Sequence, residues 1–265
     1  MVLSALRGGV AFLTRLPVGG DETCWDAFRR TPVVFPLVGY LVGLLAALPL
    51  FGPTLLSALP LLPGVPPLPL NAAVAGYLLA LYAVTGITHA DGLADVGDAF
   101  SVHGDADRRT AVLKDSETGV GGTLAVVLVV VALALGALGL PTSGWGALPA
   151  VRVVVAAEVA AKTAMALLVC VGSAPHQGLG SQLVEAVDGW WIVPVLTLSL
   201  PVVFVPGPAA PSALAAVAAA PLVALGVGWW ATRTLGGVSG DVLGTANELT
   251  RVVALHAGVV GWTYF

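Results

Sequence analysis

The stretch VVFPLVGYLVGLLAALPLFGPTLLSAL, residues 33–59, contains no charged side chain. A helix that crosses a bilayer needs roughly 20 predominantly apolar residues, so this run is long enough to span one. The whole chain of 265 residues is 57% hydrophobic and only 10% charged, whereas soluble domains carry about 25% charged residues. The sequence therefore predicts an all-α fold, a polytopic integral membrane helical bundle that forms a single domain over residues 1–265.

Further apolar runs bring the predicted number of transmembrane helices to about seven, and six to eight fit the same pattern. They cover residues 70–86, 123–140, 151–171, 191–205, 212–231 and 252–265. The connections at 60–69, 141–150 and 207–211 carry no Lys or Arg, while nine of the eleven basic residues lie in the N-terminal segment and the other loops. Because basic loops stay on the cytoplasmic side, we expect a cytoplasmic N-terminus, with every charged loop on that face of the cell membrane.

The rest of the composition limits the choice of partners. A net charge of −4 gives no basic surface for a nucleic acid. Cys24 and Cys170 lie far apart without metal-binding spacing, so we expect free thiols. The piece Val10–Leu13 predicts a short interfacial helix. The lipid bilayer is thus a predicted partner, whereas the sequence does not decide between a monomer and a homo-oligomer.

The run THADGLADVGDAF, residues 88–100, carries an acidic cluster. If it is helical, Asp91, Asp95 and Asp98 stand at i, i+4 and i+7 and share one face of the helix. Three carboxylates so close repel one another unless a cation lies between them, and hard oxygen ligands suit Mg²⁺. A merely solvated acidic face is the alternative, but it leaves the clustering unexplained.

Two more pairs of ionisable residues are candidates for a functional site. Glu158 and Lys162 are four apart inside a predicted span, so they face each other on one side of the helix. Ionisable groups at that depth are costly and indicate function, although a neutralised structural pair explains them equally well. Asp241 and Glu248, in the predicted loop 232–251, form a secondary acidic site on the same membrane face. The glycines around them could instead serve a turn and close helix packing.

Cationic residues follow the acidic cluster. Arg108, Arg109 and Lys114 lie within 25 residues of the aspartates. Phosphoryl transfer needs carboxylates that hold a cation beside arginines that can contact phosphate oxygens. Ordinary positive-inside anchoring explains the two arginines as well. The run KDSETGVGG, residues 114–122, puts polar donors and glycines before a helix N-terminus and so predicts an anion cradle.

Several of these segments together resemble the cobalamin synthase family, the adenosylcobinamide-GDP ribazoletransferases. The resemblance is carried by HADGLADVGDAF, KDSETGVGG and LGGVSGDVLGTANE, and by FLTRLPV and FPLVGYLVG near the N-terminus. It implies a Mg²⁺-dependent enzyme of the cytoplasmic membrane with adenosylcobinamide-GDP and α-ribazole, or α-ribazole 5′-phosphate, as substrates. The products would be GMP and adenosylcobalamin or its 5′-phosphate.

The resemblance and the residues together predict a metal-assisted phosphoryl substitution. Asp91, Asp95 and Asp98 would bind Mg²⁺, and either Asp115 or His89 would accept the proton of the attacking hydroxyl. The residues predicted to steady the phosphate oxygens are Arg108, Arg109, Lys114 and Lys162.

Two other functions compete with this prediction. A phosphatidyltransferase-like enzyme that uses a nucleotide-activated lipid also combines a membrane bundle with spaced aspartates, but its motif has Ala-Arg where Asp95 follows Ala94 here. A membrane transporter usually places its ionisable residues near the bilayer midplane. Apart from Glu158 and Lys162, the polar residues here gather in predicted loops on one face, which favours an enzyme.

Overall fold

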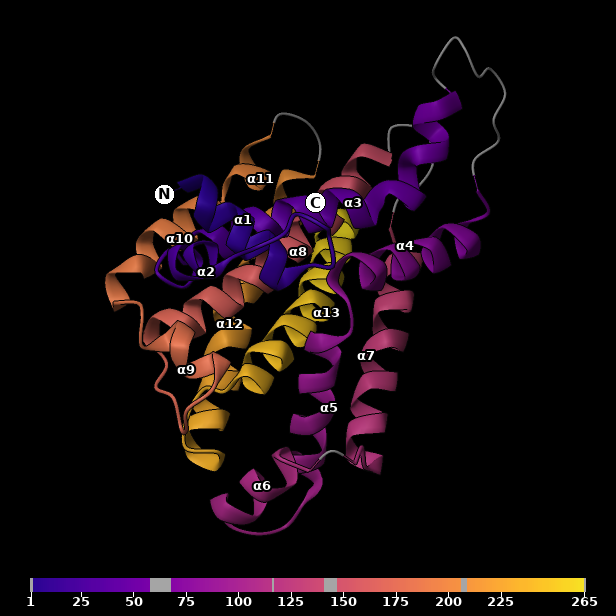
Figure 1. The fold of residues 1–265 in the computed structure, drawn as a ribbon. Coiled ribbons are helices and arrows are strands. Elements are labelled where there is room, and N and C mark those ends of the chain that lie inside the picture. Colours follow the sequence, from indigo (N-terminus) through magenta and orange to yellow (C-terminus); the bar gives the residue numbers. More distant parts are fainter. Residues whose placement is uncertain (1, 58–67, 116, 141–146, 206–208, 265) are drawn as a thin grey trace.

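The computed structural model describes residues 2–57, 68–115, 117–140, 147–205 and 209–264. These residues form α-helices joined by short connections and one 3-10 turn (Figure 1). The elements are α1 (Val2–Leu13), α2 (Glu22–Arg29), α3 (Val34–Ser57), α4 (Leu70–Thr85), α5 (Thr88–Ser101), α6 (Ala106–Leu113), α7 (Val120–Leu138), α8 (Ala147–Val171), α9 (Leu179–Val184), η2 (Gly189–Trp191), α10 (Ile192–Ser199), α11 (Pro201–Phe204), α12 (Ala210–Thr234) and α13 (Gly240–Tyr264). The predicted all-α fold is confirmed.

Helix α8 is the centre of the bundle. In its 18-residue apolar stretch, 100% of the residues are buried inside the protein. The corresponding share is 28% in α7, which is therefore a peripheral helix. Helices α3, α12 and α13 all pack on α8. The contact with α3 is close because glycine stands at Gly39 and Gly43: a Cβ there would lie 2.8 Å from the Glu158 carbonyl oxygen and 2.7 Å from the Val155 Cα. Small residues at such crossings allow helix backbones to approach in a membrane.

Among the described residues, four helices are long and apolar enough to cross a membrane: Val34–Gly52, Val120–Leu138, Leu148–Val171 and Ala210–Thr234. Helices α4 and α5 pass the same test as a pair, bent by 94°, which makes five. The chain is therefore a multi-pass membrane protein, but the predicted count of seven is not confirmed. The uncharged connections at 60–69, 141–150 and 207–211 lie partly outside the described residues.

Three predicted segments differ from the structure. The fifth span, 191–205, is interrupted into η2, α10 and α11. The predicted loop 232–251 is largely helical, because α13 begins at Gly240 and includes the residues assigned to the loop's second half. The interfacial helix is longer than Val10–Leu13 and starts at Val2. Cys24 and Cys170 are free and buried, as predicted.

The bend between α4 and α5 directs the acidic segment away from α4. Gly86 ends α4 with φ +71°, a left-handed conformation that glycine adopts without strain. The chain then turns into α5, which runs between α13 and α7 (Figure 1). The bend thus puts the acidic face of α5 next to the first turns of α13.

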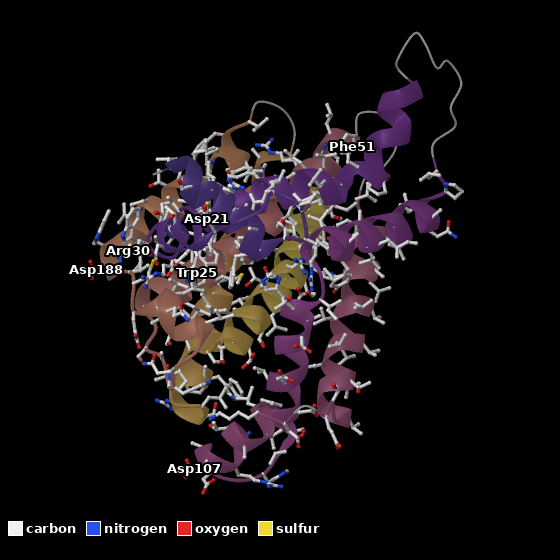
Figure 2. All side chains as sticks on the ribbon, in the orientation of Figure 1. Asp21, Trp25, Arg30, Phe51, Asp107 and Asp188 are labelled. Atoms are coloured by element: carbon white, nitrogen blue, oxygen red, sulfur yellow. The ribbon has the colours of Figure 1, made fainter. Side chains whose placement is uncertain are left out.

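Helices α1 and α2 lie on the side of the bundle opposite α6. Asp21 caps α2 by accepting the Cys24 amide hydrogen at 2.8 Å. Trp25 and Asp21 appear on this side in Figure 2, whereas Asp107 of α6 marks the far end. Phe12 of α1 packs against Trp25 and Phe28, with ring centroids 5.0 and 5.6 Å away. These rings fix α1 beside the cavity described below.

Candidate active site

The acidic motif forms α5, so the condition under which its three aspartates share one helix face is met, and they lie about one turn apart. They differ in exposure: Asp91 is exposed, Asp95 is partly buried and Asp98 is buried. Asp98 accepts hydrogen bonds from the backbone N–H groups of Gly119 and Gly122, at 2.7 and 2.9 Å. Both donors belong to the N-terminus of α7, where unpaired N–H groups and the helix dipole favour a negative charge.

The glycine-rich N-terminus of α7 therefore binds a carboxylate of the same chain, that of Asp98. A Cβ on Gly122 would lie 2.6 Å from a carboxylate oxygen of Asp98, so glycine is needed there for the close approach. The predicted anion cradle in residues 114–122 is present in this form. Asp98, predicted as a metal ligand, uses both carboxylate oxygens to fix α5 against α7.

A fourth aspartate comes from α13. A Cβ on Gly92 would lie 2.8 Å from the Cα of Asp241, and the Thr245 hydroxyl donates to the Gly92 carbonyl oxygen at 3.1 Å. The two helices thus cross with almost no side chain between them. Asp95 experiences the charges of Asp241 and Asp91 as well as that of Asp98. The predicted contribution of Asp241 to the acidic cluster is consistent with this placement.

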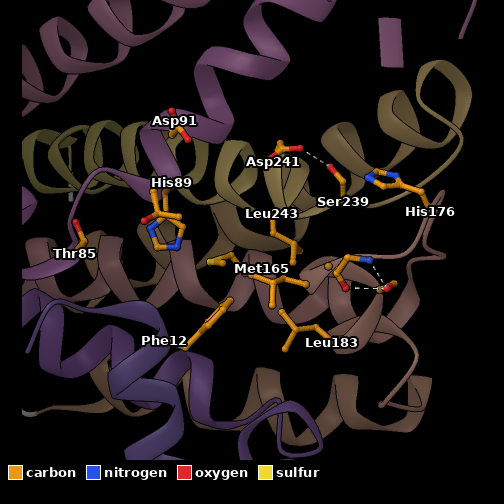
Figure 3. A pocket seen from close by; sticks show the side chains of 16 residues that line it. Phe12, Thr85, His89, Asp91, Met165, His176, Leu183, Ser239, Asp241 and Leu243 are labelled. Carbon is orange, nitrogen blue, oxygen red and sulfur yellow. Dashed lines mark hydrogen bonds between the residues drawn. The ribbon is translucent and has the colours of Figure 1, made fainter. Parts of the chain in front are cut away.

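A cavity of about 340 Å³ opens beside this crossing (Figure 3). Its polar lining includes His89, Asp91, His176, Ser239 and Asp241. The Ser239 hydroxyl donates to Asp241 at 3.3 Å. Burial raises the pKa of Asp241, although this hydrogen bond and the nearby His176 act in the opposite direction. The ionised form of Asp241 therefore lowers the free energy of unfolding.

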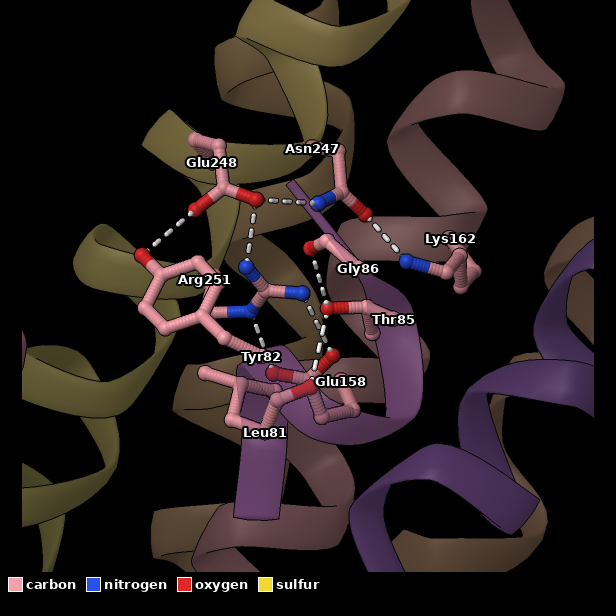
Figure 4. Close-up of polar contacts among 9 residues, drawn as sticks. All are labelled: Leu81, Tyr82, Thr85, Gly86, Glu158, Lys162, Asn247, Glu248 and Arg251. Carbon is pink, nitrogen blue, oxygen red and sulfur yellow. Dashed lines mark hydrogen bonds and ion pairs between the residues drawn. The ribbon is translucent and has the colours of Figure 1, made fainter. Parts of the chain in front are cut away.

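A second polar group lies deeper, between α8 and α13 (Figure 4). Arg251 forms a two-pronged ion pair with Glu158, with nitrogen–oxygen distances of 2.5 and 3.0 Å, and also contacts Glu248 at 2.5 Å. Asn247 donates to Glu248 at 3.0 Å and accepts from Lys162 at 2.5 Å. The four charged members carry two positive and two negative charges, so this core network is formally neutral.

This network corrects three predictions. Glu158 pairs with Arg251 of α13, not with Lys162, whose amine instead contacts Asn247. Glu248 does not join Asp241 in a secondary acidic site, since it is 1% exposed and paired with Arg251. Lys162 is fully buried, so it does not reach the cavity surface where a phosphate would bind.

The two predicted proton acceptors lie in different surroundings. His89 lines the cavity but is only 8% exposed, and its Nδ1 atom has no hydrogen-bond partner within the described residues. Lys162 and Arg251 of the core network act on it electrostatically. Asp115 is exposed, accepts the Glu117 amide hydrogen at 3.2 Å and does not line the cavity.

The predicted phosphate contacts on and after α6 are also outside the cavity lining. Arg109 donates to the Ala99 carbonyl oxygen at 2.7 Å and so caps the end of α5. Arg108 and Lys114 are exposed. The structure does not bring these three cations to Asp91 and Asp241.

The sequence did not point to several polar residues of the cavity and of the core network. Ser239 and Ser181 line the cavity, and Asn247 and Arg251 belong to the core network. Arg251 stands three residues after Glu248 in a helix, and that spacing was the available signal. In the part of the chain that the structure describes, no three His, Cys, Asp or Glu side chains are close enough to hold one metal ion by themselves.

Comparison with known proteins gives a consistent result. A family model described as cobalamin-5-phosphate synthase matches residues 5–259. A Halorubrum lacusprofundi protein named adenosylcobinamide-GDP ribazoletransferase is 51% identical over 271 residues, which cover 100% of both chains. Proteins of the same name from Haloquadratum walsbyi and Thermococcus gammatolerans are 49% and 35% identical, with at least 98% of each chain covered. No solved structure matches the chain.

Proposed function

The chain belongs to the cobalamin-5-phosphate synthase family, and from this premise we propose that it is an adenosylcobinamide-GDP ribazoletransferase. Its substrates would be adenosylcobinamide-GDP and α-ribazole or α-ribazole 5′-phosphate, taken at the cytoplasmic face of the cell membrane. The observation that best supports a site for this chemistry is the crossing of α5 and α13. It gathers Asp91, Asp95 and Asp241 beside a cavity that His89 also lines.

The proposed reaction is a substitution at phosphorus. A ribose hydroxyl oxygen of α-ribazole, not the 5′ oxygen that carries the phosphate in α-ribazole 5′-phosphate, forms a bond to the phosphorus on the cobinamide side of the pyrophosphate. The bond from that phosphorus to the bridging oxygen breaks, and GMP leaves with the electron pair. The hydroxyl proton passes to a base of the protein or to solvent.

The acidic residues fit a magnesium ion by the chemistry of their donors. Mg²⁺ is usually bound through one or two carboxylates together with water and substrate phosphates, so three protein ligands are not required. Asp91, Asp95 and Asp241 would hold it, while Asp98 positions α5 through its bonds to α7. When bound, the ion neutralises charge on the pyrophosphate and on the departing GMP.

The other predicted roles are assigned by position. His89 is the preferred proton acceptor because it lines the cavity with an unpartnered Nδ1 atom, and Asp115 is the second candidate. Arg108, Arg109 and Lys114 would contact the nucleotide part of the large substrate, outside the cavity.

The proposal is tested by GMP release from adenosylcobinamide-GDP by the purified full chain in detergent. We expect release to require both α-ribazole and Mg²⁺ and to be lost in Asp95→Asn. Asp107→Asn, an exposed carboxylate on α6, is the matched control and should keep wild-type activity. Folded protein that releases no GMP but transfers a nucleotide-activated lipid would instead support the phosphatidyltransferase-like alternative.

A further inference from the structure

The cavity beside α5 and α13 has two chemically different walls (Figure 3). The ionisable wall carries His89, Asp91 and Asp241. The other wall is apolar and is formed by Phe12 of α1, Met165 of α8, Leu183 of α9 and Leu243 of α13. A ligand that fills such a cavity needs a flat or compact apolar part and a polar part at its other end.

Phe12 is the aromatic surface of the apolar wall. Its ring is 38% exposed although it packs against Trp25 and Phe28 at 5.0 and 5.6 Å between centroids. The neighbouring rings hold it in place, so the part left open is a preformed aromatic surface rather than a mobile side chain. Aromatic ligands stack well on such surfaces.

The size of the cavity limits its occupant. A volume of about 340 Å³ lies near the lower end of ligand pockets. It suits a nucleoside with one bicyclic base, but it cannot enclose a corrinoid joined to a nucleotide. Of the two substrates of the proposed reaction, only the ribazole is small enough to enter whole.

A second hollow provides a contrast within the same molecule. It measures about 470 Å³ and lies among α5, α7, α12 and α13, with Leu93, Phe100 and Trp230 in its lining. Ser101 and Thr245 are its polar side chains, and no ionisable side chain of the described residues lines it. It therefore offers nothing to orient a ribose hydroxyl toward the acidic cluster.

We propose that the two-walled cavity is the subsite for the nucleoside substrate. The benzimidazole base lies against Phe12, Met165 and Leu183, and the ribose points toward His89 and Asp91. This arrangement rests on the proposed function and extends it, because it places the attacking ribose hydroxyl beside the acidic cluster. Adenosylcobinamide-GDP then approaches from outside the cavity.

The test compares Phe12→Ala with Phe100→Ala, its counterpart in the second hollow. Initial rates of GMP release are measured while each substrate is varied separately. In Phe12→Ala we expect KM for α-ribazole to rise roughly three- to tenfold, as loss of one aromatic contact predicts. KM for adenosylcobinamide-GDP should stay within about twofold, and Phe100→Ala should change neither value.

A base series separates direct contact from a general disturbance of the fold. Wild-type protein should prefer the α-riboside of dimethylbenzimidazole over that of imidazole, and Phe12→Ala should lose much of this preference. Phe12→Leu keeps an apolar side chain against Trp25 and Phe28, so it serves if the alanine variant does not fold. A rise confined to KM for adenosylcobinamide-GDP, or an unchanged base preference, would overturn the subsite.

Direct binding keeps this inference distinct from the proposed reaction. Titration of the full-length protein with α-ribazole alone requires no turnover. Weaker binding in Phe12→Ala than in Phe100→Ala supports the subsite even if wild-type protein releases no GMP. Equal binding in wild type and Phe12→Ala refutes the subsite even if GMP release establishes the reaction.

Discussion

Acidic side chains occur in two regions of the bundle that differ in how their charge is compensated. At the crossing of α5 and α13, Asp91, Asp95 and Asp241 form no ion pair with Lys or Arg among the described residues. In the core network, Glu158 and Glu248 share Arg251 and are almost completely buried. The first region has negative charge left over for a cation, whereas the second is already balanced. Position in the fold, more than residue type, separates a binding site from a structural network.

The largest effect is expected from breaking the balance of the core network. Arg251→Met leaves Glu158 and Glu248 without the arginine that both pair with, and loss of one partner of a buried pair costs about 3–5 kcal/mol. We expect a much lower midpoint of thermal unfolding in detergent. Arg108→Met removes an exposed arginine and should change the midpoint little.

A rescue variant makes this test specific. Adding Glu158→Gln to Arg251→Met removes one of the uncompensated charges and should recover part of the lost stability. If the double variant unfolds at the same temperature as Arg251→Met, the network does not act through charge balance.

The second expected effect concerns activity and not folding. Asp95→Asn should slow GMP release by roughly a hundredfold or more, because a group that stabilises transition-state charge is lost. Its unfolding midpoint should not fall, since the carboxylate lies among like charges. Mg²⁺ should raise the midpoint of wild-type protein by binding the folded state, and this shift should disappear in the variant. A retained shift would place the metal elsewhere.

A smaller effect distinguishes Asp98 from the other aspartates of its motif. Asparagine offers one carbonyl oxygen, whereas Asp98 uses both oxygens to accept from Gly119 and Gly122. Asp98→Asn should therefore cost about 1 kcal/mol of stability, as loss of a helix cap does. Activity should fall less than in Asp95→Asn. Equal losses of activity in both variants would make Asp98 a metal ligand as well.

The smallest effect is a gain in stability. Because burial raises the pKa of Asp241, the folded chain binds a proton there more tightly than the unfolded chain does. Stability therefore falls as pH rises through that raised pKa. Asp241→Asn should remove this dependence, add about 0.5 kcal/mol or more near neutral pH, and slow GMP release. Lower stability at pH 7 would contradict the assignment.

The sequence predicted the segments whose pattern is local. Residues 33–59 and the helical spacing of Asp91, Asp95 and Asp98 follow from composition and from periods of three and four residues. The spacing of Glu158 and Lys162 also placed them on one helix face. It did not reveal which helix lies against that face, because Arg251 is 93 residues away from Glu158.

The remaining features depend on contacts between distant segments. Three charged residues in α13 made its first half resemble a loop, although two of them, Glu248 and Arg251, form an ion pair in the folded chain. No local pattern shows that Asp98 caps a helix that starts more than 20 residues later. The sequence alone places Phe12 in an interfacial helix, and only the fold shows that it lines a cavity together with residues of α8 and α13.

The pairing of Glu158 with Arg251 has a consequence for how the protein is made. A ribosome delivers α8 to the membrane well before α13, so Glu158 enters the bilayer region while its partner has not yet been synthesised. The two helices therefore reach their final arrangement only after translation has passed Arg251. Until then, the nascent chain must shelter a carboxylate from lipid, by protonation, by water or by the insertion machinery. The step that completes the bundle is thus also the step that neutralises its core.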